Sequence, residues 1–126
     1  MKIKVEPSMI SWRVRKVLFL LMVAFVAYVE GFTNPFWIWN CVPIAASYLL
    51  LARARRKNTE PLPEIAFFVI ACGAVLFAHA AWLNDWGGTA TGSSTAGLMF
   101  VVLPVYASVL GGVAFGLAVL FRRRRQ

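Results

Sequence analysis

Charged and chemically reactive side chains are scarce in this chain. Its 126 residues include five Asp or Glu, one His and two Cys, and charged residues make up 14% of the whole. A soluble domain has about 25% charged residues, because polar groups must cover its surface. The composition therefore excludes an ordinary soluble fold and favours an integral membrane protein, while the length suits a single domain.

The side chains that most enzymes and metal sites need are also few. Cys41 and Cys72 each lie within an apolar segment, with no Cys-x-x-Cys pair and no Cys/His cluster. The sequence has no Gly-rich phosphate loop, no pair of His at helical spacing and no nucleophile elbow. We therefore expect no catalytic residues, no metal site and no cofactor, and we predict that the protein is not an enzyme.

Apolar sequence is what the chain has in abundance, at 60% of its residues. A membrane-spanning helix needs about 20 mostly apolar residues. Four segments approach that length, covering approximately residues 17–33, 35–52, 65–83 and 95–121. Turn-forming or polar stretches that contain Gly, Pro or Asn separate them. The sequence thus predicts one all-α membrane domain over residues 1–126, with four transmembrane helices in an antiparallel up-down bundle.

The basic residues predict how this bundle is oriented. All thirteen Lys and Arg, which give a net charge of +8, fall within residues 2–16, 53–57 and 122–125. With four spans these three clusters share one side of the membrane, and cytoplasmic loops are the ones enriched in Lys and Arg. We therefore expect both termini in the cytoplasm and a multi-pass protein of the plasma membrane, namely a bacterial inner membrane. Because the clusters flank apolar segments, we expect no nucleic-acid partner.

A cleaved signal peptide is the alternative interpretation of the first span. The basic start and the length of the apolar segment suit one. Residues 27–31, at the exit of the segment, offer no small-x-small cleavage site. We therefore expect an uncleaved helix.

A stripe of small residues in the last segment predicts close helix packing. Ser108, Gly112 and Gly116 recur at intervals of four and so lie on one helical face. Membrane helices associate through such faces, because small side chains let two backbones approach. We expect this stripe to pack against the Ala-rich third segment. A homo-oligomer contact is the alternative.

Four polar residues fall near the predicted outer ends of the spans: Glu30, Asn40, His79 and Asp85. Trp37, Trp39, Trp82 and Trp86 lie at a similar depth, as in the aromatic belt at a membrane interface. Under one interpretation Glu30 simply marks the end of a helix and reaches headgroup water. Under the other, these side chains form an outward-facing polar site for a cation, a proton or a small polar ligand. A close, water-poor contact between Glu30, Asn40 and His79 would favour the second.

The chain ends in a basic run that directly follows the last apolar residue. Arg122, Arg123, Arg124 and Arg125 suit a stop-transfer anchor on the cytoplasmic side. They also suit contact with anionic lipid headgroups, which attract each basic residue near the surface by about 1 kcal/mol.

These features favour a protein that works by binding others through its helix faces over one that catalyses a reaction. We expect a small polytopic protein that serves as an accessory, regulatory or protective, immunity-like subunit by binding another membrane component or a copy of itself. The alternative is a small oligomeric transporter or channel with its polar site around Glu30 and His79.

Overall fold

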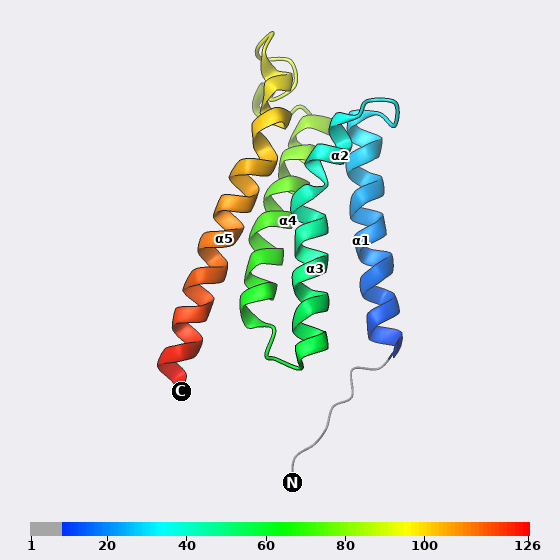
Figure 1. Cartoon of the computed structure of the whole chain (residues 1–126). Helices are drawn as coiled ribbons and strands as arrows, with labels where there is room; N and C mark the ends of the chain where they lie inside the picture. Colours follow the sequence, from blue (N-terminus) through cyan, green and yellow to red (C-terminus); the bar gives the residue numbers. More distant parts are fainter. Residues whose placement is uncertain (1–8) are drawn as a thin grey trace.

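The computed structural model describes the backbone of residues 9–126 and the side chains from residue 12 onward, and the regular structure of this part is entirely helical. Its long helices are α1 (Met9–Glu30), α3 (Val42–Lys57), α4 (Leu62–Leu83) and α5 (Met99–Arg125) (Figure 1). Three short elements join them, namely α2 (Phe36–Asn40) and the 3₁₀ turns η1 (Trp86–Gly88) and η2 (Ala96–Leu98). Lys2 and Lys4 of the first basic cluster lie outside the described residues.

Several helices extend beyond the apolar segments that predicted them. α1 already includes Arg13 and Lys16, and α3 continues to Lys57. Lys and Arg are good helix formers, so a basic residue need not end a helix where the apolar sequence ends. α1 stops at Glu30 because Gly31 has a φ of +90°, which L-residues rarely adopt.

The second predicted span is divided into α2 and α3. The two helices meet at Cys41, between Asn40 and Val42. Pro43 has no N–H to donate to the carbonyl of Trp39, and its ring crowds the preceding turn. Prediction of one continuous helix over residues 35–52 was therefore wrong.

Two helices are long and apolar enough to cross a membrane, judged by length and composition over the described residues. They are α4 and the segment 96–125, which contains α5. α1 begins with basic residues and ends in Glu30, while α3 alone has 16 residues and ends in a basic run. The all-α fold class and two apolar helices are thus established.

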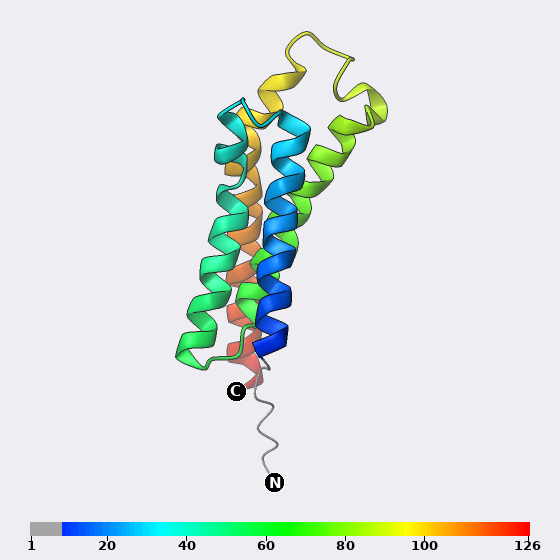
Figure 2. The ribbon, with the colours of Figure 1, turned by 90° about the vertical axis from the view of Figure 1, so that its right-hand side faces the viewer.

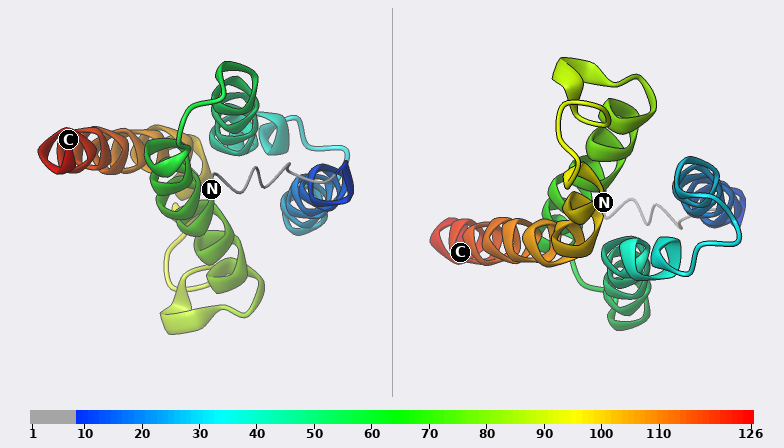
Figure 3. Two further views of the ribbon diagram at one scale, coloured as in Figure 1. Left: turned by 90° about the horizontal axis from the view of Figure 1, so that it is seen from below. Right: turned by 90° about the horizontal axis from the view of Figure 1, so that it is seen from above.

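α4 lies at the centre of the arrangement. It packs against α5 on one side and against α3 and α1 on the other (Figure 3). α4 is tilted relative to α1 and α3, so the loop between α4 and α5 projects to one side (Figure 2). Each long helix contributes a fully or almost fully buried side chain to the interior: Val26, Ile44, Val75 and Ala107.

The close contact between α4 and α5 uses a different glycine from the predicted one. A Cβ added at Gly111 would lie 2.9 Å from the Cβ of Ala71 and from a ring carbon of Phe67. Gly112 and Gly116 are exposed, and a Cβ added at either would meet nothing within 4 Å. The two helices do pack together, but the stripe Ser108, Gly112 and Gly116 is not the face that makes this contact. Consecutive helical residues point about 100° apart, so the contact through Gly111 turns Gly112 outward.

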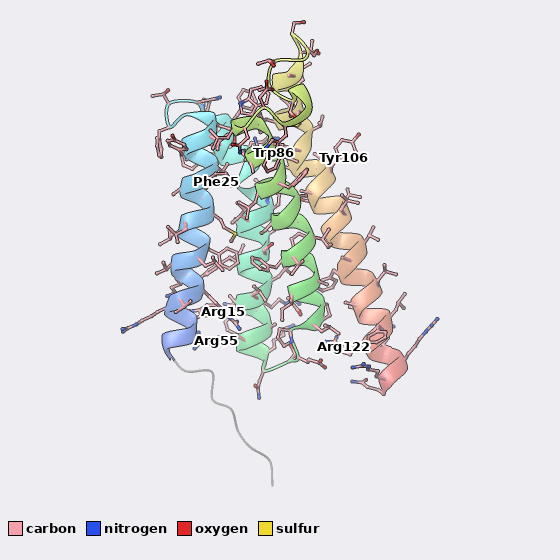
Figure 4. The ribbon with its side chains drawn as sticks, turned by 180° about the vertical axis from the view of Figure 1, so that it is seen from behind. Arg15, Phe25, Arg55, Trp86, Tyr106 and Arg122 are labelled. Carbon is pink, nitrogen blue, oxygen red and sulfur yellow. The ribbon has the colours of Figure 1, made fainter. Side chains whose placement is uncertain are left out.

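The two ends of the molecule differ in chemistry. Arg15, Arg55 and Arg122 lie toward the same end of the molecule, which we name the basic end (Figure 4). Trp86 lies at the opposite end, where α1 stops, α2 begins and α4 stops. We name this the tryptophan end.

Candidate functional site

Three helices each bring one polar side chain to the tryptophan end. Glu30 is the last residue of α1, Asn40 is the last residue of α2, and His79 lies one turn before the end of α4. The turn at residues 31–34 reverses the chain between the first two. Its backbone is closed by a hydrogen bond of 3.0 Å from the Asn34 amide to the Gly31 carbonyl.

These three side chains form one hydrogen-bonded cluster, which we name the Glu30 cluster. Asn40 Nδ2 donates to Glu30 Oε1 at 3.0 Å. His79 Nε2 lies 2.9 Å from Glu30 Oε2. Both carboxyl oxygens of Glu30 are thus engaged, one by each of the other helices.

The cluster is shielded from its surroundings. Asn40 and His79 have no exposed surface, and the Glu30 side chain is 3% exposed. The ring of Phe100 on α5 covers His79, with 4.7 Å between ring centroids. A carboxyl group so enclosed is strongly disfavoured in its charged form unless it is paired and hydrogen-bonded. Glu30 is therefore not an open helix end that reaches headgroup water.

The hydrogen bonds of His79 fix the proton on Nδ1 and place a second proton between His79 and Glu30. Nδ1 is 2.7 Å from the carbonyl oxygen of Val75, and a carbonyl only accepts, so Nδ1 carries a proton and donates it. The contact between Nε2 and Glu30 Oε2 then needs one further proton. Either Glu30 is protonated and donates to a neutral His79, or a charged His79 donates to a Glu30 carboxylate. In both arrangements the pair holds one shared proton.

Asn40 has an acceptor that no described residue satisfies. Its Nδ2 faces two acceptors, Glu30 Oε1 and the carbonyl of Phe36 at 3.2 Å, so exchanging the amide nitrogen and oxygen would oppose acceptors to acceptors. Oδ1 is therefore correctly placed, and it is buried without a donor. An unsatisfied buried acceptor costs about 1–3 kcal/mol.

Asp85, the fourth predicted polar residue, belongs to a separate local structure. It has a φ of +50° just after α4, and its carboxylate accepts from the Ala90 amide, the Thr91 amide and the Thr91 hydroxyl. These bonds lower the pKa of Asp85, the Thr91 hydroxyl most of all, followed by the Ala90 amide. Within the described chain Asp85 makes no hydrogen bond to the Glu30 cluster.

The four tryptophans are held in different ways. The indole N–H of Trp39 donates to the Val101 carbonyl of α5 at 2.8 Å, and that of Trp37 donates to the Phe32 carbonyl at 3.1 Å. Trp82 packs edge-on against Phe100, while Trp86 is half exposed and lies beside Phe77. Trp39 thus fastens α2 to α5, a contact that an aromatic belt alone does not require.

Sequence reasoning missed three contributors to the cluster. The carbonyls of Val75 and Phe36 lie four residues before His79 and Asn40, so helical geometry alone would have suggested them. Phe100 carries no such signal, because its contact with His79 depends on how α5 packs.

The other residues singled out from the sequence are the two cysteines and the terminal arginines. In the part of the chain that the structure describes, no three His, Cys, Asp or Glu side chains are grouped so as to hold a metal ion. Cys41 and Cys72 are free and buried, and Cys72 donates to the Ser47 hydroxyl at 3.3 Å.

Arg122 donates to the Glu60 carbonyl, Arg125 lies over the Phe121 ring, and Arg123 and Arg124 are exposed.

Comparison with known protein families, with curated protein sequences and with solved structures found no match to this chain.

Proposed function

We propose that this protein is a plasma-membrane protein with four spans and both termini in the cytoplasm, and that it carries out proton-linked transport through the Glu30 cluster. The four-span arrangement is supported by large apolar side chains that face outward from every long helix. Leu20 on α1, Leu49 on α3, Phe77 on α4 and Leu117 on α5 are each more than 60% exposed. Lipid would cover these side chains at little cost, whereas water would not. The arginines at the basic end support a cytoplasmic location for both termini.

The observation that carries the transport proposal is the buried contact of 2.9 Å between Glu30 and His79, which needs a proton between its two partners. Ionisable groups enclosed within membrane helices are costly, and they commonly mark proton or ion pathways. Loss of the shared proton would set a carboxylate against the lone pair of His79 Nε2. The hydrogen bond between α1 and α4 would then be lost, so that proton release is coupled to the packing of these two helices.

Glu30→Gln is the variant that tests this coupling, because it preserves both hydrogen bonds. A glutamine oxygen accepts from Asn40 Nδ2, and its amide N–H donates to the neutral Nε2 of His79. The variant should fold and insert like the wild type while holding no exchangeable carboxyl proton.

The experiment measures proton entry into proteoliposomes that contain the pH indicator pyranine. A potassium gradient with valinomycin sets the interior negative. We expect the wild type to acidify the interior at least about tenfold faster than Glu30→Gln, as for loss of an essential proton-transferring group. Equal rates for the two proteins, including no proton entry with either, would contradict the proposal.

A second candidate function is that of an accessory or protective subunit, and the exposed face of α5 favours it. Gly112 and Gly116 lie open on this face, as a helix–helix contact with another membrane protein or a second copy would need. Cross-linking from Cys introduced at position 113 in native membranes tests this candidate. A cross-linked species that Gly116→Leu removes would support it, whereas a cross-link that survives Gly116→Leu would count against this face.

A further inference from the structure

A cavity lies beside the Glu30 cluster at the tryptophan end. Its volume is about 320 Å³, and it is bounded by the end of α1, the start of α2, the end of α4 and the start of α5. Glu30 belongs both to the cluster and to the wall of this cavity. The volume is at the lower limit of the range typical of ligand pockets, so the cavity suits a small molecule.

Glu30 is the one charged residue in the cavity wall, whose other residues are apolar, aromatic or uncharged. No Lys or Arg occurs in residues 17–52 or 58–121. His79 is therefore the one basic side chain that the described residues bring to this end. The nearby acidic residues are Glu30 and Asp85, although the chain as a whole is strongly basic. A cationic ligand that enters here meets Glu30 with no lysine or arginine to repel it, and it can replace the proton that Glu30 shares with His79.

Aromatic side chains form much of the rest of the wall. Phe36, Trp82 and Phe100 come from α2, α4 and α5, and Trp82 packs edge-on against Phe100. The faces of aromatic rings attract ammonium groups, Trp most strongly, and the attraction grows when water is excluded. Glu30 and several aromatic rings around one cavity together match an ammonium ligand better than an anion or a neutral sugar.

We propose that this cavity binds a small organic cation, a quaternary or protonated amine, next to Glu30. The inference rests on the proposed function, because binding of the cation is expected to release the proton that Glu30 and His79 share. The positive ligand favours the Glu30 carboxylate, the shared proton leaves to bulk water, and His79 stays neutral through its Nδ1–H bond to Val75. One positive charge enters and one leaves, so the net charge of the buried site is unchanged.

The test compares two probes of similar shape that differ in charge, choline and 3,3-dimethylbutan-1-ol, on the full chain in nanodiscs. Isothermal titration in two buffers of different ionisation enthalpy measures affinity and the number of protons released. We expect choline to bind at least about tenfold more tightly than the neutral alcohol, as for a desolvated cation over aromatic rings and a carboxylate. Close to one proton should be released per choline bound.

Matched variants locate the binding site. Trp82 lines the cavity, whereas Trp86 does not. Trp82→Leu should weaken choline binding at least about fivefold and Trp86→Leu should leave it unchanged, because only the first removes a ring from the site. Glu30→Gln should abolish the proton release.

Each outcome separates this inference from the proposed function. Equal affinity for the two probes, or no binding of either, would overturn the cation site even if Glu30-dependent proton entry is found in liposomes. Choline binding that Trp86→Leu weakens as much as Trp82→Leu would place the site elsewhere and would also overturn it. Tight choline binding without proton release would leave a cation site but would contradict the exchange.

Discussion

The two ends of this molecule carry their charges in opposite ways. At the basic end there are many charged groups, and most of them are exposed, as with Arg53, Arg56 and Arg124. At the tryptophan end there are few, yet Glu30 is almost fully enclosed and meets His79 across two helices. We therefore expect the buried Glu30–His79 pair to contribute more to the stability of the fold than the exposed basic side chains do.

The difference follows from what each environment does to a charge. Exposed ionic groups are screened and contribute about 0–1 kcal/mol per pair. Groups removed from water must satisfy each other, so loss of one partner strands the other. Substitutions that remove one side chain at either end, followed by measurement of the free energy of unfolding, test this comparison directly.

The largest effect on stability is expected at His79. His79→Ala removes the partner of Glu30 Oε2 and leaves a cavity under Phe100. We expect the free energy of unfolding to fall by about 2–5 kcal/mol, as for a broken buried pair. Unfolding in mixed micelles with increasing denaturing detergent measures it.

Two control variants provide smaller expected losses of stability with which His79→Ala can be compared. Glu30→Gln keeps both hydrogen bonds and should cost less than half as much as His79→Ala. Arg56→Gln, at an exposed position of the basic end, should change stability by less than about 0.5 kcal/mol. If His79→Ala and Arg56→Gln had equal effects, the two ends would not differ in the way described.

The apolar contact between α4 and α5 lies between the two ends, and substitutions there show how much packing alone contributes to stability. Gly111→Leu places new atoms against Ala71 and Phe67 and should destabilise the protein by about 1–3 kcal/mol or more. Gly112→Leu, one residue along, points into open space and should be neutral for the fold of a single chain. The same unfolding assay applies, and a larger loss for Gly112→Leu would show that α5 is rotated from the orientation described.

These glycines also show how far the sequence could predict the fold. Apolar segment lengths predicted an all-α fold but not the division of the second segment into α2 and α3, and the small residues predicted that the last two long helices pack together. Spacing alone did not say which of two neighbouring glycines makes the contact, because stripes that start at Gly111 and at Gly112 have the same period of four. That choice depends on the shapes of Ala71 and Phe67 on the other helix.

The sequence predicted the level of the site residues along their helices but not which of them are in contact. Counting residues from the helix ends placed Glu30, Asn40 and His79 at one level, and the structure brings them together. The same counting included Asp85, which instead bonds to Ala90 and Thr91 in its own loop. Depth along a helix can be counted from sequence, whereas rotation about its axis and the path of a loop depend on tertiary contacts.

Asp85 predicts a smaller, pH-dependent effect at the tryptophan end. Its pKa in the folded protein lies below the ordinary value of 3.8, because the Thr91 hydroxyl and the Ala90 amide donate to the carboxylate. This contribution to loop order is therefore complete above pH 3.8 and is lost as the pH falls through the lower, folded value. Amide chemical shifts of Ala90 and Thr91, followed by NMR in micelles, should titrate with a midpoint below 3.8.

A conservative variant checks the cause of this shift. Thr91→Val removes the hydroxyl donor and keeps the shape, so the midpoint should rise toward the ordinary value. An unchanged midpoint in Thr91→Val would mean that the backbone amides alone lower the pKa.

The smallest effect on the fold is expected at the end of α5. Arg123 and Arg124 are exposed, so Arg123→Gln with Arg124→Gln should leave stability within about 0.5 kcal/mol of the wild type. The double variant should nevertheless bind anionic lipid more weakly, by about 1 kcal/mol for each arginine removed near the surface. Native mass spectrometry of protein from nanodiscs that contain phosphatidylglycerol measures the retained lipid. Loss of lipid without loss of stability would show that the charges of the basic end act on the bilayer, whereas those of the tryptophan end act within the protein. A loss of stability as large as that of His79→Ala would instead show that this end, too, is held together by its charges.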